Sequence, residues 1–303
     1  MRVFVTGASG HMGSAVVPEL LRAGHQVVGL ARSDRAAETL KAAGAEVRRG
    51  DLDDLDGLHE AAAAADGVIH LAFKHDLMGA GRMDDAVAAD LAAVEALGAP
   101  LEGTGKPLVI TSGTLMLIPL GITGRSGTEA DVAAGGPRAD AENLVIGLAE
   151  RGVRSSVVRL PPIVHSPLDH HGFTRILVAI ARQTGASAYV GDGANRWPSV
   201  HTLDAARVYR LALETAPPGS RLHAVADEGI PFRAIASAIA RGADVPVVSV
   251  TAEEAAGRFA FLGPAVALDN PSSSETTRAL LDWSPTHPGL LEDLTEPHYF
   301  TQP

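Results

Sequence analysis

The chain of 303 residues contains no cysteine. This absence excludes disulfides, thiolate nucleophiles and cysteine-ligated metal sites. The sequence also has no run of Lys or Arg, and its formal net charge is -11, which makes nucleic acid and anionic membranes poor partners. No apolar run approaches the ~20 residues that span a bilayer, and no leader-like segment stands at the start. These absences together predict a cytoplasmic protein with a small-molecule partner.

Short apolar runs alternate with alanine-rich helical stretches through the first half of the chain, which is 46 % hydrophobic and 20 % charged overall. This alternation predicts an α/β fold with a doubly wound parallel sheet, the Rossmann fold. The pattern loosens after Pro161. We therefore expect a Rossmann domain over residues 1–160 plus about 200–225. We expect a small substrate-covering lobe over residues 161–199 and 226–303, built mainly of short helices.

A glycine-rich loop follows the first predicted strand and opens the first helix. It reads Thr6-Gly-Ala-Ser-Gly-His-Met-Gly13. The first glycine permits a tight turn, the second a close approach to a pyrophosphate, and the third close packing of helix on strand. The loop therefore predicts a dinucleotide site at a helix N-terminus. Its candidate cofactor-binding residues are Gly7, Ser9, Gly10, His11, Met12 and Gly13.

The TGxxGxxG spacing resembles the extended short-chain dehydrogenase/reductase family, which includes the NAD-dependent epimerase/dehydratase proteins. Further matching stretches follow in the family's order: RGDLDD (49–54), VIHLAF (68–73), VITSG (109–113) and PSVHTLDAARVY (198–209). The resemblance implies contacts to the adenine and along the cofactor. The residues it implies are Asp51, Leu52, Leu71, Ala72, Phe73 and Pro161.

The end of the second predicted strand bears on the choice between NADP and NAD. An NAD site places a carboxylate there, and an NADP site an arginine. The chain has Arg32 and Ser33 first, able to bind a 2′-phosphate through charge-assisted hydrogen bonds, and Asp34 next. This order favours NADP, and Asp34 leaves NAD open.

Carbonyl-reducing members of this family resemble each other in a Ser/Thr, a Tyr and a Lys four residues after the Tyr. The chain has no Tyr-x-x-x-Lys, because its only lysines are residues 41, 74 and 106 and its only tyrosines are residues 189, 209 and 299. The stretch around Ala141-Glu142 resembles the family's catalytic helix, and counting back from it places Ala134 at the tyrosine position and Arg138 at the lysine position. The absence of both residues resembles an atypical subgroup of the family that keeps the cofactor loop and loses the usual catalytic residues. Arg138 cannot act as a base, since its pKa lies above 12, but it could bind the cofactor or a substrate anion.

Three stretches could supply another proton donor or substrate contact at the carboxyl edge of the sheet. Lys74 follows the fourth strand, and Ser112 and Thr114 follow the fifth. The stretch after the sixth strand holds His165 and His171, with Asp169 able to orient a ring. Metal binding is a weak alternative for these histidines, so we expect no metal site. Tyr189 and Trp197 are expected to line the same pocket.

The sequence therefore favours an NADP-dependent reductase of ketones, aldehydes or imines with a non-standard proton donor. Imines suit a site without tyrosine because they are protonated more easily than ketones. A non-catalytic NAD(P)-binding redox sensor is the alternative, and an epimerase or isomerase is a third reading. Apolar helices over residues 87–99 and 141–152 would permit a homodimer.

Overall fold

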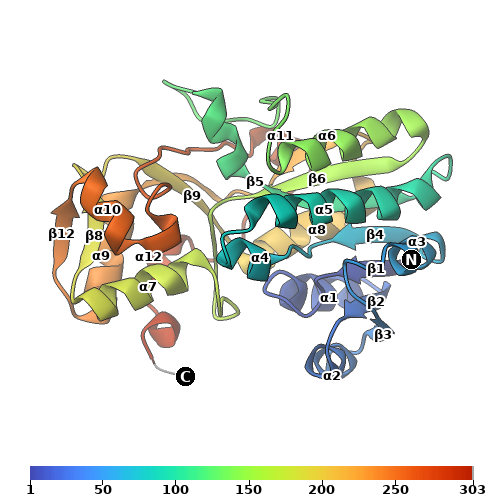
Figure 1. Cartoon of the computed structure of the whole chain (residues 1–303), viewed down its shortest axis with the longest axis horizontal. Coiled ribbons are helices and arrows are strands. Elements are labelled where there is room, and N and C mark those ends of the chain that lie inside the picture. Colours follow the sequence, from blue (N-terminus) through green and yellow to red (C-terminus); the bar gives the residue numbers. More distant parts are fainter. Residues whose placement is uncertain (302–303) are drawn as a thin grey trace.

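A seven-stranded parallel sheet forms one half of the computed structural model, which describes residues 1–301 (Figure 1). The strand order is β10-β6-β5-β4-β1-β2-β3. The strands are β1 (Arg2–Thr6), β2 (Gln26–Ala31), β3 (Glu46–Arg49), β4 (Gly67–His70), β5 (Pro107–Gly113), β6 (Arg154–Leu160) and β10 (Ser220–His223). The order reverses between β1 and β4, where an open parallel sheet forms its ligand crevice. The predicted doubly wound Rossmann fold is confirmed.

Helices cover both faces of this sheet, so its strands are apolar on both sides. One face carries α1 (Gly13–Arg22), α2 (Asp34–Ala42) and α8 (Thr202–Thr215), and its core includes Leu20 and Val208. The other face carries α3 (Leu55–Ala63), α5 (Met83–Gly98) and α6 (Ala139–Gly147), and its core includes Leu58, Leu97 and Val145. Local capping starts α2, where the Ser33 hydroxyl accepts from the N–H of Ala36 at 3.2 Å.

Four short helical turns follow strands or helices of this half. They are α4 (His75–Gly79), η1 (Ala99–Leu101), η2 (Thr114–Leu120) and η3 (Leu148–Arg151). The turns α4 and η2 come directly after β4 and β5, at the carboxyl edge of the sheet. They place the residues that follow these strands close to the switch point.

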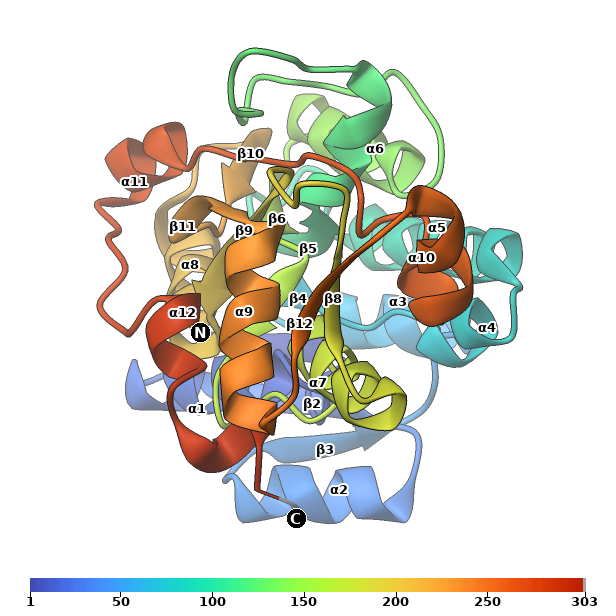
Figure 2. The ribbon, with the colours of Figure 1, turned by 90° about the vertical axis from the view of Figure 1, so that its left-hand side faces the viewer.

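The second half is a smaller lobe with its own apolar core, which includes Trp197, Phe232 and Ile235 (Figures 1 and 2). One sheet holds β7 (Ile163–His165), β9 (Arg196–His201) and β11 (Asp227–Pro231), and another pairs β8 (Ser187–Val190) with β12 (Val247–Val250). The helices are α7 (Phe173–Thr184), α9 (Phe232–Ala243), α10 (Ala252–Arg258), η4 (Ala260–Leu262), α12 (Leu290–Asp293) and η5 (Pro297–Tyr299). The lobe thus contains β-sheet as well as the short helices that we expected.

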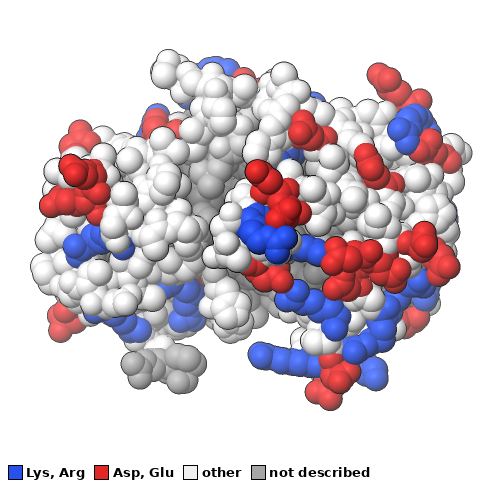
Figure 3. Space-filling model, viewed as in Figure 1, with Lys and Arg blue, Asp and Glu red and all other residues white. Residues whose placement is uncertain are grey.

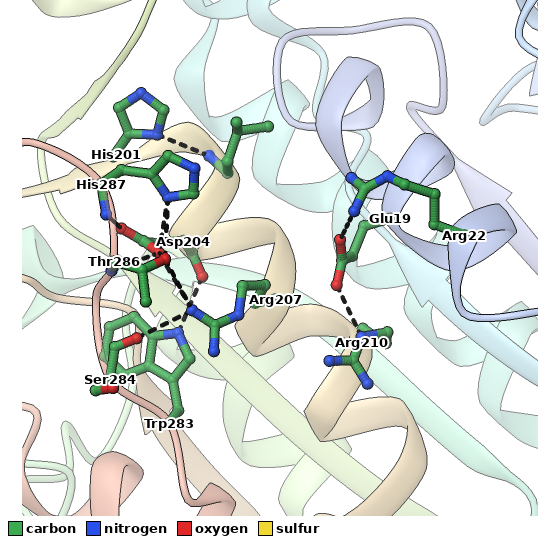
Figure 4. A network of polar contacts seen from close by, with 11 residues as sticks. Glu19, Arg22, His201, Asp204, Arg207, Arg210, Trp283, Ser284, Thr286 and His287 are labelled. Atoms are coloured by element: carbon green, nitrogen blue, oxygen red, sulfur yellow. Dashed lines mark hydrogen bonds and ion pairs between the residues drawn. The ribbon is translucent and has the colours of Figure 1, made fainter.

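Part of the C-terminal segment returns to the Rossmann half. Helix α11 (Glu275–Leu281) packs against α8 and β10, and Trp283 lies in the core beneath α8. The buried Asp204 carboxylate, at the start of α8, accepts from the N–H groups of Thr286 and His287, both at 3.0 Å (Figure 4). The expected lobe range of 226–303 therefore includes residues that complete the Rossmann half.

No helix within residues 1–301 is long and apolar enough to cross a membrane. Over the same residues, no group of three or more histidine, aspartate and glutamate side chains is arranged to hold a metal ion.

Candidate active site

The phosphate loop, residues 7–13 between β1 and α1, has the geometry of an anion cradle. Gly7 adopts φ +66°, and a Cβ there would lie 2.7 Å from the N atom of Ala72. A Cβ on Gly13 would lie 2.3 Å from the carbonyl oxygen of Ala8. Within residues 1–301, the N–H groups of His11, Met12 and Gly13 have no hydrogen-bond acceptor. Unpaired N–H groups at a helix N-terminus fit a dinucleotide pyrophosphate.

His11 connects this loop to the start of α8. Its Nε2 lies 3.1 Å from the hydroxyl of Thr202, the first residue of α8. Burial lowers the pKa of His11, the charge of Asp169 raises it, and the charges of His170 and His171 lower it further. The loop after β7 therefore lies beside the phosphate loop. His171 is exposed there, near the cofactor cradle.

Three ion pairs surround the region where the adenosine end of a dinucleotide would lie, beyond β2 and β3. Arg32, 71 % exposed, lies 3.7 Å from Asp76 of α4. Asp34 accepts from Arg49 at 2.9 Å, and Lys74 lies 2.5 Å from Asp53. The Lys74 ammonium therefore points toward the residues after β3, and we do not propose it as the proton donor. Of the residues proposed to flank the adenine, Asp51 is exposed and Leu52 is buried in the core.

Arg138 lies at the centre of a polar network at the carboxyl edge of the sheet. One guanidinium nitrogen donates to the Asp90 carboxylate at 2.9 Å, and the other donates to the carbonyl of Thr111 at 2.5 Å. Asp90 is buried and also contacts the His70 ring at 3.2 Å. The other ring nitrogen of His70 lies 2.7 Å from the Thr6 hydroxyl. This network joins the ends of β1, β4 and β5 to the start of α6.

The Arg138 guanidinium also stacks on Phe73, with its carbon 4.5 Å from the ring centroid. On the same ring, His75 packs edge-on with the centroids 5.3 Å apart. Leu71 and Ala72, which precede Phe73, are half-buried along the route from the phosphate loop. The segment after β4 thus connects the phosphate cradle to Arg138.

The hydroxyl groups after β5 are engaged within the protein. The Ser112 hydroxyl contacts the Met116 sulfur at 3.2 Å. The Thr114 hydroxyl donates to the Asn270 side chain at 2.8 Å, and that side chain donates back to the Thr114 carbonyl at 3.0 Å. Thr114 is fully buried and Ser112 is 5 % exposed. In this structure the Thr114 hydroxyl holds the C-terminal segment to the sheet and does not face an open site.

His165 is fully buried at the end of β7, where its Nδ1 contacts Asp293 at 2.8 Å. Its Nε2 has no partner within the described residues. Asp169 binds the N–H of Gly172 at 2.6 Å and the hydroxyl of Tyr299 at 3.2 Å, so it orients no histidine ring. With no surface exposure, the His165 ring does not reach a substrate, and we no longer propose it as an acid.

The structure also shows that no phenol takes the place of the missing tyrosine. Tyr209 is fully buried with its hydroxyl 2.8 Å from that of Thr111, and burial raises its pKa. Tyr299 is buried beneath the loop after β7, and Tyr189 is half-buried in the lobe. Trp197 is fully buried in the lobe core, so it packs the lobe and does not line a pocket as we expected. Pro161 is also buried.

Residues 3–114 match the NAD-dependent epimerase/dehydratase family. An uncharacterised protein of Schizosaccharomyces pombe is 46 % identical over 99 % of this chain and all of its own length. A 2-alkyl-3-oxoalkanoate reductase of Stenotrophomonas maltophilia is 30 % identical over 73 % of this chain and 67 % of its own. The chain belongs to the NAD-dependent epimerase/dehydratase family.

A dTDP-glucose 4,6-dehydratase of Streptomyces venezuelae, solved with NAD and TYD bound, shares the fold with a TM-score of 0.77 and 19 % identity. The match covers 97 % of this chain and 96 % of the dehydratase. Family membership identifies the chain as an NAD(P)-dependent enzyme.

Sequence reasoning missed three members of this site. Asp90 is the counter-ion of Arg138, His70 links it to β1, and His75 stacks on Phe73. Asp90 lies within an alanine-rich helix at a position that faces the core, where an ionised residue is rare unless it is paired. An aspartate at a core-facing position of an apolar helix was the one sequence signal that could have indicated a buried ionic partner for Arg138.

Proposed function

We propose that this enzyme is an NADP-dependent reductase of a ketone, an aldehyde or an imine. One observation carries the proposal: the unpaired N–H groups of the phosphate loop lie at the same sheet edge as the anchored Arg138. The 30 % sequence identity with a 2-alkyl-3-oxoalkanoate reductase supports carbonyl reduction over epimerisation. When bound, a reduced nicotinamide would supply the hydride.

The arrangement of charges supports NADP over NAD. Asp34, the carboxylate that would favour NAD, is 94 % exposed and forms a weak surface pair with Arg49, so this pair does not decide between the cofactors. Among the residues that the structure describes, Arg32 is held only by Asp76 at 3.7 Å, and both side chains are more than half exposed. Such a pair contributes little, so a 2′-phosphate can replace Asp76 at the guanidinium and gain a charge-assisted hydrogen bond.

Arg138 favours a neutral group over an anionic one. Its charge is offset by the buried Asp90, and two of its five N–H donors are occupied. The side chain remains 23 % exposed, so the remaining donors can bind a cofactor hydroxyl or a substrate oxygen. Because a guanidinium keeps its proton, the proton that completes the reduction has to come from another group.

The test is oxidation of NADPH and, in parallel, NADH by the purified protein with a panel of ketones, aldehydes and cyclic imines. Calorimetric binding of both cofactors accompanies it. We expect Arg32→Ala to weaken NADPH about tenfold or more, since a charge-assisted bond contributes ~1.5–3 kcal/mol, and to leave NADH unchanged. Arg35→Ala, an exposed charge one turn away, is the matched control. Equal losses for both cofactors would refute the NADP proposal.

Tight NADPH binding without turnover on any substrate would instead favour the redox sensor. Hydride exchange on a sugar nucleotide would favour the epimerase. The lobe as substrate cover, a homodimer through α5 and α6, and the cytoplasmic location stay predictions. Sedimentation velocity and cell fractionation would test the last two.

A further inference from the structure

Three side chains form a continuous stack at the carboxyl edge of the sheet: Arg138, Phe73 and His75. The guanidinium covers the Phe73 ring, and His75 packs against that ring edge-on at an interplanar angle of 73°. His75 is the first residue of α4 and follows the non-helical segment 71–74 after β4, and its backbone N–H donates to the carbonyl of Phe73 at 2.9 Å. The stack therefore gives the imidazole a defined place beside Arg138.

We propose that His75 is the proton donor of the reduction, an inference that rests on the proposed function. His75 is exposed to solvent, and its ring packs on Phe73, whose face is covered by Arg138, the residue that we place at the lysine position of the family. No function assigned above uses this ring. In contrast, the ring of His165 is buried, and the charge of His171 acts on His11 of the phosphate loop.

The other candidates are held by partners that keep them from this role. Lys74 is bound to Asp53, the Ser112 hydroxyl faces Met116, and the Thr114 hydroxyl donates to Asn270. Aliphatic hydroxyl groups are also poor proton donors on their own. Among the candidates within residues 1–301, His75 combines exposure, an imidazole able to titrate near neutral pH and contact with the Phe73 ring that Arg138 covers.

The proposed step balances with a nicotinamide as the named hydride source. The hydride adds to the carbonyl or imine carbon, and the electron pair of the double bond moves to oxygen or nitrogen. The His75 imidazolium gives its N–H proton to that atom and becomes neutral imidazole. Solvent then returns a proton to the ring. Arg138 donates hydrogen bonds throughout and transfers no proton.

The surroundings of His75 make its imidazolium a ready donor. Partial burial lowers its pKa below the ordinary 6.5, the Phe73 carbonyl raises it, the charge of Arg138 lowers it, and Asp76 on the same helix raises it. A lowered pKa means that reduction depends on a protonated fraction that grows as pH falls. The rate of reduction is therefore expected to rise toward acidic pH until the ring is fully protonated.

The experiment compares wild type with His75→Gln and with the control His59→Gln, an exposed histidine of α3. We expect His75→Gln to lower kcat about 100-fold or more, to leave the Kd for NADPH within twofold, and to flatten the rise in kcat toward acidic pH. His59→Gln should match wild type in all three. Turnover by wild type together with unchanged kcat and pH profile in His75→Gln would overturn the inference and leave the reductase standing. Absence of turnover in wild type would overturn the proposed function itself.

A readout without turnover uses histidine ring resonances in NMR titrations of the free protein. We expect a ring signal that is missing in His75→Gln to titrate below 6.5 in wild type. In Arg138→Met, which removes the charge and keeps an apolar stem on Phe73, the same signal should titrate at higher pH. A His75 signal that is unaffected by Arg138→Met would show that the stack does not tune the ring, and would overturn the inference.

Discussion

Loss of the Arg138 charge tests the central network of the site through stability alone. Asp90 is 4 % exposed at its side chain, and within residues 1–301 its side-chain partners are the Arg138 guanidinium and the His70 ring. Arg138→Met would leave a buried carboxylate without a guanidinium, a change that typically costs 3–5 kcal/mol. Because His70 still contacts Asp90, we expect a loss near the lower end, about 3 kcal/mol.

A double-mutant cycle separates this pair from general disruption. Asp90→Asn leaves a guanidinium that is 23 % exposed and still bound to the Thr111 carbonyl, so we expect a smaller loss of about 1–2 kcal/mol. The double variant Asp90→Asn with Arg138→Met contains no unpaired charge. It should be more stable than the sum of the single losses predicts, by at least ~1.5 kcal/mol.

The assay is urea denaturation of the four proteins followed by circular dichroism, with the midpoint and slope compared at one pH and salt concentration. Additive losses, with a coupling energy below ~0.5 kcal/mol, would refute the reasoning that the two charges neutralise each other in the interior. A loss below ~1 kcal/mol for Arg138→Met would refute the claim that Asp90 depends on it.

Three further predictions concern Gly13 in the phosphate loop, the buried His201 and the hydrogen bond of Thr114 to Asn270. Gly13→Ala should abolish NADPH binding in a fluorescence titration because its Cβ would meet the Ala8 carbonyl, whereas Gly147→Ala, with open space around it, should bind normally. Burial lowers the pKa of His201 to about 4, so the folded state favours the neutral ring more than the unfolded state does. The free energy of unfolding should therefore fall by up to ~3 kcal/mol as pH drops from 6.5 to 4. A urea midpoint that does not change over this pH range would contradict the prediction. Thr114→Val should cost about 1–2 kcal/mol because the buried amide oxygen of Asn270 loses the hydroxyl donor, and Thr114→Ser should cost much less. Equal urea midpoints for the two variants would refute a stabilising role of this hydrogen bond.

The Rossmann half follows closely from sequence periodicity because its strands are buried on both faces. Runs such as residues 3–5 and 108–110 are wholly apolar, as strands buried on both faces of such a sheet are expected to be. The glycines of the phosphate loop are required by close backbone contacts to Ala8 and Ala72. β10, β11 and β12 were missed. They are four or five residues long, and they pair with strands distant in sequence, as β12 does with β8.

The sequence predicted the residues of the candidate site whose positions follow from the order of strands and helices, but not the side-chain partners of those residues. The positions of Arg32 and Arg138 follow from the family's order of elements, whereas the partners of Lys74 and Thr114 lie 21 and 156 residues away in the sequence. His165 looked available because it follows a strand, but α12 returns from the C-terminus and covers it through Asp293. The sequence around His165 gives no indication that a segment more than a hundred residues away covers the ring.

The expectation that Arg138 stands at the family's lysine position, which stays a prediction, has a consequence for where protons move in this site. A lysine can lower the pKa of a neighbouring phenol, and so needs the phenol beside it. Here the neighbouring position is Ala134, and the guanidinium is fixed instead by Asp90 and by Phe73. A charge held in this way still acts on the titratable ring across Phe73, which is His75. In the proposed mechanism, the proton is thus donated from His75 at the start of α4 and not from the loop that precedes α6.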